Sequence, residues 1–582
     1  MKANCTLALA IAGVLVLENL GRAAPGPDVS TRDYWPTAGW KTAAPEEYGF
    51  DTNALAAAIQ QAPQICPQLH SLLVVRQGRL VVERYFNQTS EKDAWNVKSA
   101  SKSMISALIG VALEQGYIRS LDQPAIDFFP EYRAQLDDPR KSRITIRHLL
   151  TMTAGLEWSE NGPITFRWLR SRDRVGFTWK SKLVAEPGTR WNYSTATTHL
   201  LSAILTKATG TNTLAFARRA LFDPLGASVD RWDQDRQGYY IGGSEVYLTP
   251  RDMAKFGYLY LNRGRWDGKQ IVPESWVQAS TEQSNSAQYG FLWWMDTFEG
   301  RPIYFAQGFG GQHIVVVPHL DVVVVTTAYM PTHYSALTLS KLWVLPCINR
   351  FEPAARELPS AEKVIGEFYR AIGGREQLAK LESLRILGRV EVPAKAERGT
   401  FEVLKGGRGK ILSQLKGARL WPGSCGSDGT TVWSNWRGYG ILSGERAQCW
   451  RDEAHDWSDL RRPVEGMKTV AVTPFAGKPC YQLQLRRETG EFLTDYYDVE
   501  TGLLAGSIRS EGSPYGLLAV TRLFNDYRRW GVFQFPSRIV TRVQGPEGVL
   551  TRTAIQYNGV DTREFDLPIP IEDILKGKPS GR

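Results

Sequence analysis

The sequence predicts an α+β protein in which an antiparallel sheet flanked by helices is followed by a mainly antiparallel β domain. Three observations support this prediction. Strand-like apolar runs lie near both ends of the first part, and the chain between them has a mostly helical pattern. Beyond residue 372, short alternating runs separated by turn residues take over. Strands at both ends of a helical region imply one antiparallel sheet covered by helices.

The strands of the first part come from two places in the sequence. Residues 71–86 contain two apolar runs joined at Gln77-Gly78, which is the signal of a hairpin. Two further runs, 314–318 and 322–328, surround a short turn, and a helical stretch follows at 335–351. We expect these runs to pair in one sheet.

A buried helix is predicted to begin at Ser99-Ala-Ser-Lys102 and to end at Gly116. Serine and lysine three residues apart share one face of a helix, so the amine can reach the hydroxyl proton. At the start of a helix, the backbone N–H groups and the dipole favour the anion that develops in acyl transfer. The apolar stripe of this helix consists of Met104, Ile105, Leu108, Ala112 and Leu113.

Two other Ser-x-x-Lys matches have structural interpretations. Ser360, ahead of Lys363, is predicted to cap a helix over residues 361–372. Ser413, ahead of Lys416, lies in a strand-like stretch. Only the match at Ser99 opens a buried helix, so it is the candidate nucleophile.

The second part is predicted to be rich in strands. The helix over 361–372 leads through two glycines into alternating runs at 384–392, 481–485 and 492–498. At 582 residues the chain is too long for one ordinary domain. We therefore expect domains at 25–352 and 353–582.

The first 24 residues resemble a signal peptide. Met1-Lys2 precedes an apolar run over residues 7–17, and small residues follow at Ala23-Ala24. The run is too short to span a bilayer, and no later run is long enough. We expect a secreted or periplasmic protein without a transmembrane segment.

Composition argues against several classes of function. The net charge is +10, but the Lys and Arg residues are scattered rather than clustered, so a nucleic-acid partner is not expected. With seven histidines and no His/Cys cluster, we expect no metal site and no cofactor. The nucleophile elbow of α/β-hydrolases is absent from the sequence.

Residues 35–350 resemble the β-lactamase-related serine hydrolases, in particular the branch with class C β-lactamases, carboxylesterases and 6-aminohexanoate-dimer hydrolase. The resemblance implies a β-lactamase/transpeptidase-like domain. Beyond the Ser99 helix it rests on four motif segments, Arg147–Leu156, Glu186–Thr195, Thr249–Gly257 and Tyr289–Trp294.

The resemblance also implies a role for each site residue. Ser99 is the nucleophile, Lys102 its activating base and Tyr193 the second proton-relay group. A basic Lys102 requires burial or a cationic neighbour, because a free lysine has a pKa near ~10.4. The segment Phe309-Gly310-Gly311-Gln312 matches the substrate strand, with the oxyanion held by the N–H groups of Ser99 and Gln312. The two glycines suit a strand edge over which a substrate carbonyl lies.

Two positions depart from the pattern of this family. The usual Tyr-x-Asn is Tyr193-Ser-Thr195, and Phe309 stands where a Lys or His usually leads the third motif. The asparagine normally helps to hold the lysine, and the basic residue helps to bind a substrate carboxylate. A site without that positive charge is expected to prefer neutral esters or amides.

The second part more faintly resembles lipoprotein-carrier-like modules of envelope enzymes, through residues 371–379 and 496–504. Such modules form a curved sheet with an apolar concave face, so the resemblance implies a lipid or envelope ligand there. In the fold that the first part resembles, Cys66 and Cys347 lie on helices packed on one sheet, which implies a disulfide between them.

Three functions are consistent with these sequence features. The first is an exported serine hydrolase that cleaves a small ester or amide through an acyl-enzyme on Ser99. The second is a β-lactamase or D,D-peptidase, and the third is a non-catalytic envelope ligand-binding protein.

Overall fold

The structure is a computed structural model. It describes residues 32–284, 287–330, 334–348, 358–407, 409–417, 423–435, 440–443, 447, 466–487, 490–513, 516–543 and 547–576. The expected signal peptide and the expected domain boundary between residues 352 and 353 lie outside the described residues.

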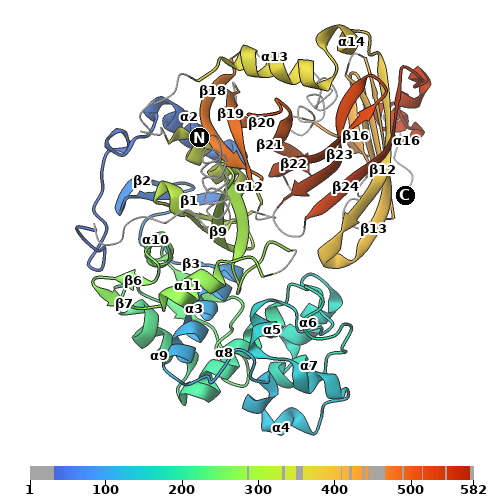
Figure 1. Ribbon diagram of the computed structural model, residues 1–582. Helices are drawn as coiled ribbons and strands as arrows, with labels where there is room; N and C mark the ends of the chain where they lie inside the picture. Colours follow the sequence, from blue (N-terminus) through green and yellow to red (C-terminus); the bar gives the residue numbers. More distant parts are fainter. Residues whose placement is uncertain are drawn as a thin grey trace, which may run out of the picture.

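An antiparallel sheet organises the first part (Figure 1). Its six described strands are ordered β2-β1-β11-β10-β9-β8. The first hairpin, β1 and β2, pairs with β11, which is the last strand of this sheet in sequence order. Val74 of β1 lies opposite Val324 of β11. The predicted sheet is therefore confirmed. The strands are β1 (Leu69–Arg76), β2 (Arg79–Tyr85), β8 (Trp294–Phe298), β9 (Arg301–Gly308), β10 (Gln312–Val317) and β11 (Val322–Ala328).

Both faces of this sheet are buried, which explains its runs of consecutive valines. Val316 and Val323 face the cluster that contains α3, α8 and α10. Val315 and Val324 face the opposite cluster, which contains α2 and α12. The helices are α2 (Thr52–Ile65), α3 (Ser101–Glu114), α4 (Pro130–Arg133), α5 (Ile146–Leu150), α6 (Pro163–Arg170), α7 (Arg174–Lys180), α8 (Thr195–Thr209), α9 (Thr213–Ala217), α10 (Pro250–Leu261), α11 (Glu274–Ser280) and α12 (Tyr334–Leu339).

Short strands hold the chain just ahead of Ser99. β3 (Trp95–Asn96) pairs with β5 (Val246–Leu248), which also pairs with β4 (Arg231–Trp232). The Val97 N–H then donates to the Val246 carbonyl at 2.8 Å. A separate pair, β6 (Arg265–Trp266) and β7 (Lys269–Gln270), lies farther along the chain.

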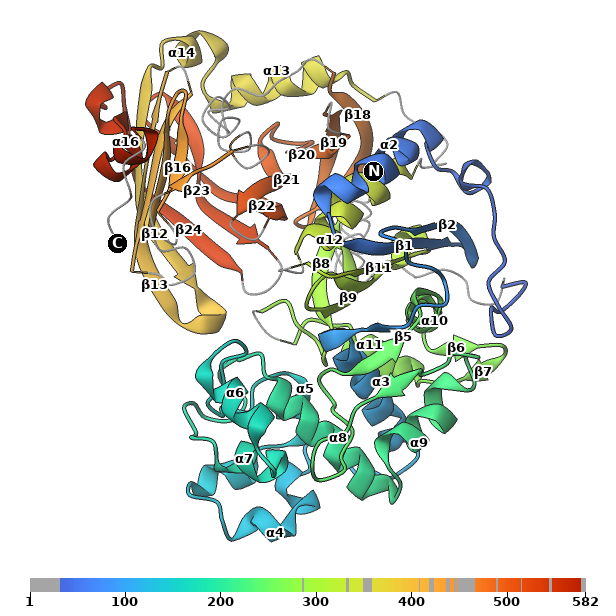
Figure 2. The same ribbon diagram turned by 180° about the vertical axis from the view of Figure 1, so that it is seen from behind.

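A second antiparallel sheet forms the C-terminal part and curls beneath α13 (Ala361–Ile372) (Figure 2). Its described strands run in the order β17-β16-β15-β14-β13-β12-β24-β23-β22-β21-β20-β19-β18. The β-rich prediction is confirmed. The bounds are β12 (Ser383–Val392), β13 (Glu397–Gly406), β14 (Lys410–Lys416), β15 (Gly423–Asp428), β16 (Val432–Ser434), β17 (Gly440–Ile441), β18 (Lys468–Phe475), β19 (Lys478–Arg486), β20 (Phe492–Asp498), β21 (Leu504–Ser513), β22 (Gly516–Trp530), β23 (Phe533–Arg542), β24 (Gly548–Tyr557), α14 (Arg375–Ala379) and α16 (Ile569–Leu575).

The two parts share one apolar cluster. Helix α12 lies between the first sheet and β22, and the Thr338 hydroxyl donates to the Leu517 carbonyl at 2.9 Å. The same hydroxyl accepts from the Ala519 N–H at 3.0 Å. Phe475 and Tyr496 of the C-terminal sheet belong to the apolar cluster that covers one face of β10 and β11. The C-terminal sheet therefore contributes side chains to the core on that face of the first sheet.

The predicted disulfide between Cys66 and Cys347 is wrong, since both thiols are free and buried. The two cysteines do pack on one face of the sheet, as expected. However, Cys66 follows the last turn of α2, whereas the Cys347 carbonyl accepts from the Asp51 N–H at the start of α2. A helix of that length separates its ends by roughly 20 Å, far more than a disulfide can bridge.

Candidate active site

Ser99 lies in a tight turn directly ahead of α3. The turn is a 3₁₀ helix, Lys98–Ala100, and α3 itself begins at Ser101. Helix formation therefore starts two residues later than predicted. Lys98 adopts a φ of 51°, a conformation that costs energy for a residue with a side chain. The turn presents a half-buried Ser99 at the helix start.

Lys102 points at Ser99 from the first turn of α3. Its Nζ lies 2.8 Å from Ser99 Oγ, 2.9 Å from Thr195 Oγ1 and 2.9 Å from the Gly243 carbonyl oxygen. The residue is 1% exposed. The structure thus brings together the predicted serine–lysine pair and supplies the amine with three oxygen partners.

Burial changes the acid–base behaviour of Lys102. Removal from water lowers its pKa from 10.5 to about 8, although the negative charge of Glu160 opposes this change. At pH 7, about a tenth of the amine is then uncharged and able to accept a proton, far more than in a lysine with an unperturbed pKa. Burial is one of the two features, with a cationic neighbour as the other, that allow Lys102 to act as a base.

Tyr193 closes the site from the segment that leads into α8. Its ring lies 5.0 Å from Lys102 Nζ. Burial and Glu160 raise the pKa of Tyr193 well above its usual range, against a hydrogen bond with Ser99 that lowers it. The ring stacks on Trp294 at 5.4 Å and meets Tyr289 edge-on at 6.1 Å. The structure therefore places Tyr193 beside Ser99 as a protonated phenol.

Thr195 takes the lysine contact that the family assigns to asparagine. Ser194 caps α8 by accepting from the Thr197 N–H, which leaves Thr195 as the first helical residue with its hydroxyl toward Lys102. This hydroxyl also donates to Glu160 Oε1. The departure from Tyr-x-Asn therefore preserves a contact with the lysine.

Sequence reasoning missed two residues of this site. Glu160 lies in a loop between Trp158 and α6 and carries no motif that would reveal it. Gly243 approaches so closely that a Cβ there would lie 2.7 Å from Thr195 Cγ2 and 3.2 Å from Lys102 Nζ. Only the folded chain shows that a side chain at this position would crowd the lysine.

The predicted substrate strand is a turn at its centre. Phe309, Gly310 and Gly311 connect β9 to β10, and Gln312 is the first residue of β10. The interpretation of the glycines as a strand edge is wrong, because their φ angles of 91° and 104° belong to a left-handed turn. Phe309 is 54% exposed on this turn.

The end of β9 lies against the turn that carries Ser99. A Cβ on Gly308 would lie 2.1 Å from the Val97 carbonyl oxygen and 3.0 Å from Lys98 Cβ. The Gln312 side chain instead donates to the Ala328 carbonyl of β11. The backbone at Gly308 therefore borders the turn that carries Ser99, while the Gln312 side chain is hydrogen-bonded to a neighbouring strand.

The two other Ser-x-x-Lys matches have the predicted structural roles. Ser360 accepts a hydrogen bond from the Lys363 N–H at 3.3 Å and caps α13. Ser413 lies within β14, opposite Val403 of β13. Lys363 and Lys416 are both exposed.

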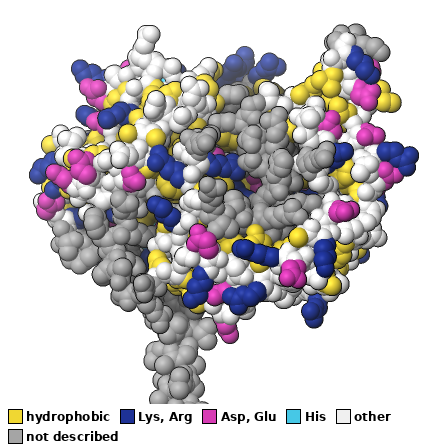
Figure 3. All heavy atoms as spheres, turned by 90° about the horizontal axis from the view of Figure 1, so that it is seen from above, with side chains coloured by type: hydrophobic (Ala, Val, Ile, Leu, Met, Phe, Trp, Pro, Cys, Tyr) yellow, Lys and Arg dark blue, Asp and Glu magenta, His cyan; other side chains and the backbone are white. Residues whose placement is uncertain are grey.

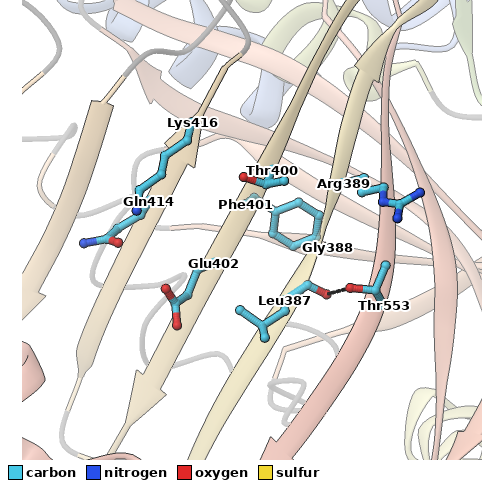
Figure 4. A pocket seen from close by; sticks show the side chains of 9 residues that line it. All are labelled: Leu387, Gly388, Arg389, Thr400, Phe401, Glu402, Gln414, Lys416 and Thr553. Carbon is cyan, nitrogen blue, oxygen red and sulfur yellow. Dashed lines mark hydrogen bonds between the residues drawn. The ribbon is translucent and has the colours of Figure 1, made fainter.

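A cavity of about 320 Å³ lies on the C-terminal sheet (Figure 4). It is open to solvent, and Arg389, Glu402 and Lys416 contribute charges to its wall. This lining does not match the apolar surface expected for a lipid. Its remaining residues are Leu387, Gly388, Thr400, Phe401, Gln414 and Thr553.

On the face seen from above, Lys and Arg side chains are interspersed with Asp and Glu (Figure 3). Within the described ranges, no helix combines the length and apolar character needed to cross a bilayer. The described residues also hold no group of three or more His, Cys, Asp or Glu side chains suited to a metal ion.

Similar proteins include two curated hydrolases. The 6-aminohexanoate-dimer hydrolase of Paenarthrobacter ureafaciens is 24% identical over 346 residues, which cover 54% of this chain and 84% of the relative. Esterase EstB of Burkholderia gladioli is 26% identical over 171 residues, covering 27% and 43%. Among solved structures, the octameric penicillin-binding protein homologue of Pyrococcus abyssi aligns with 77% of this chain and 98% of its own, at 17% identity and a TM-score of 0.41.

The family model described as "Beta-lactamase" matches residues 67–330. This range begins just before β1 and ends just after β11, so it includes the whole first sheet and every residue placed around Ser99. The matching family model and the similarity to the 6-aminohexanoate-dimer hydrolase support a β-lactamase-related serine hydrolase domain over residues 67–330.

Proposed function

We propose that this protein is an exported serine hydrolase that cleaves a carboxylic ester or amide through an acyl-enzyme on Ser99. The observation that carries the proposal is the 2.8 Å contact between Ser99 Oγ and the buried Nζ of Lys102. The names of the two curated relatives, an amide hydrolase and an esterase, support this substrate class. Export rests on the leader-like pattern of residues 1–24.

Acylation begins with Ser99 as the nucleophile. Its Oγ attacks the substrate carbonyl carbon while the hydroxyl proton passes to Lys102 Nζ. The carbonyl oxygen becomes an oxyanion, which the Ser99 N–H at the start of α3 can stabilise. We assign the second N–H to Gln312, which pairs with Gly308 across β9 and β10, because Gly308 lies against the Ser99 turn.

Collapse of the tetrahedral intermediate breaks the bond to the leaving group. The departing oxygen or nitrogen takes a proton from the Tyr193 hydroxyl. Protonated Lys102 then returns a proton to the Tyr193 oxygen, so both groups regain their starting protonation states. A water molecule then attacks the acyl-enzyme, loses its proton to the same relay and releases the acid. Ser99 recovers its hydroxyl, and no metal or cofactor is required in these steps.

A fluorophosphonate probe tests whether Ser99 is an active nucleophile. The wild-type protein is expected to react with one equivalent, and peptide mass spectrometry should place the phosphonyl group on Ser99. The surface serine Ser360, ahead of Lys363, provides an internal control and should remain unmodified. A folded protein whose Ser99 stays unlabelled would favour the non-catalytic binding function instead.

Phe309 is predicted to bias the site toward neutral substrates. Phe309→Lys should raise the ratio of kcat/KM for a cephalosporin over that for a neutral ester, because a new charge-assisted hydrogen bond contributes about 1.5–3 kcal/mol, or one to two powers of ten. Phe309→Leu, which adds no charge, is the matched control. A wild type that already prefers the cephalosporin, with an unchanged ratio in the lysine variant, would support the β-lactamase function.

A further inference from the structure

A carboxylate behind the lysine extends the site beyond the expected residues. Building on the proposed serine hydrolase function, we propose that Glu160 is a positioning residue. Through the Thr195 hydroxyl it fixes the direction of the hydrogen bonds around Lys102, so that the lone pair of the neutral amine faces Ser99.

Glu160 is held by hydrogen bonds on both of its oxygens. Oε2 accepts from the Trp158 indole N–H at 2.6 Å and from the Thr195 backbone N–H at 3.1 Å. Oε1 accepts from the Thr195 hydroxyl. The first turn of α8 thus docks on Glu160 through both the backbone and the side chain of Thr195.

The direction of these bonds follows from what each group can donate. A carboxylate only accepts, so the single proton of the Thr195 hydroxyl points to Glu160. The Thr195 oxygen must then accept from Lys102 Nζ, at 2.9 Å. The Gly243 carbonyl, also at 2.9 Å, accepts a second proton from the amine.

A neutral amine has two protons and one lone pair. With both protons committed to Thr195 and Gly243, the lone pair is left for the third neighbour, Ser99 Oγ at 2.8 Å. That is the orientation in which the lysine can accept the serine proton. Without Glu160, the Thr195 hydroxyl could turn its own proton toward the lone pair and compete with Ser99.

Glu160 also acts on Lys102 through its charge. Among the residues that the structure describes, Glu160 and Tyr193 are the titratable groups that face the amine, and Tyr289 meets the Tyr193 ring edge-on. Lys98 and Glu245 flank the site and lie 3.9 Å apart as an ion pair. Because the charge of Glu160 raises the pKa of Lys102, its removal should extend the neutral form to lower pH.

The variant Glu160→Gln removes the charge of Glu160 and changes the direction of a hydrogen bond, but it keeps a side chain of the same length in contact with Thr195. The two N–H donors at Oε2 require the amide oxygen on their side, so the amide NH₂ faces Thr195 and donates to its hydroxyl. The Thr195 proton is then free to point at Lys102, and the bond direction reverses. We expect kcat to fall by about a hundredfold with little change in KM, because a misdirected base is costly and Glu160 does not touch the substrate.

The pH profile is the readout that a purely structural role would not move. The acidic limb of kcat/KM, measured on a neutral ester, should shift downward by roughly one pH unit in Glu160→Gln. Glu157→Gln, an exposed carboxylate in the same loop, is the matched control and should leave both rate and profile unchanged. Thermal unfolding of each variant checks that the fold is retained.

Variants of Thr195 test the same chain of bonds from its other end. Thr195→Val removes the hydroxyl at nearly constant volume and should lower kcat to a similar degree, whereas Thr195→Ser should recover most of the loss. The double variant Glu160→Gln/Thr195→Val should match Thr195→Val within about twofold, because the two residues act as one unit. These variants keep the proposal testable if Glu160→Gln folds poorly.

Two outcomes distinguish this inference from the proposed function. If the wild type hydrolyses esters through a labelled Ser99 but Glu160→Gln keeps its kcat and pH profile, the role of Glu160 is overturned. If Ser99 of the folded wild type neither reacts with the probe nor supports hydrolysis, the proposed function itself fails.

Discussion

Replacing Ser99 with alanine is expected to abolish hydrolysis, with a loss on the order of a millionfold in kcat, as for other serine nucleophiles. The loss follows from the removal of the only atom proposed to bond to the substrate. The fold should survive, because Ser99 is half-buried in a surface turn and Lys102 keeps Thr195 and Gly243 as partners. Steady-state rates on ester and amide substrates, together with thermal unfolding, measure both effects.

Lysine substitutions distinguish the three Ser-x-x-Lys segments of the chain. Lys102→Met keeps the apolar volume of a buried side chain but removes the amine, and should approach the loss seen at Ser99. Lys363→Met and Lys416→Met are matched controls on exposed side chains and should retain full activity. Comparable losses in all three, or most activity retained by a folded Ser99→Ala protein, would contradict the assignment of the site.

The strands and helices near the site could be predicted because their signals are local. Consecutive valines in β10 and β11 require two buried faces, and both faces are covered in the structure. Ser360 sits directly before a helical run, so its role as a cap follows from its neighbours in sequence. The serine–lysine contact is equally local, because a spacing of three residues places both side chains on the same face of a helical turn.

The partners of Lys102 could not be predicted, because they come from distant loops. Glu160 and Thr195 are separated by 35 residues, and no spacing rule relates a loop carboxylate to a helix start. Gly243 contacts the lysine through its backbone carbonyl. Every residue carries that group, so the residue type does not reveal the contact. These contacts depend on how α3, α8 and two loops pack together.

The cysteines show a related limit. The resembled fold correctly implied that Cys66 and Cys347 share one face of the sheet. It did not show that Cys66 follows the end of α2 whereas Cys347 lies beside its start, and this separation decides whether the two sulfur atoms can meet. A shared face is therefore a weaker statement than a contact, for disulfides as for catalytic groups.

Tyr193→Phe is expected to impair amide hydrolysis far more than hydrolysis of an activated ester. Because burial and Glu160 raise the pKa of Tyr193 well above its usual range, the hydroxyl remains protonated and acts as a donor to the leaving group. An amide nitrogen needs that proton to depart, whereas p-nitrophenolate leaves as a stable anion. We expect kcat/KM to fall by about 10²–10⁴ for a p-nitroanilide and by about tenfold or less for the p-nitrophenyl ester of the same acid.

The design of this variant isolates the hydroxyl from the ring. Phenylalanine preserves the stacking on Trp294 and the edge contact with Tyr289, so the packing around Lys102 should be retained. Trp294→Phe is the control for loosened packing, and it should lower both activities by similar factors. Equal losses for the two substrates in Tyr193→Phe would instead assign the hydroxyl to activation of Ser99, a step that both substrates share.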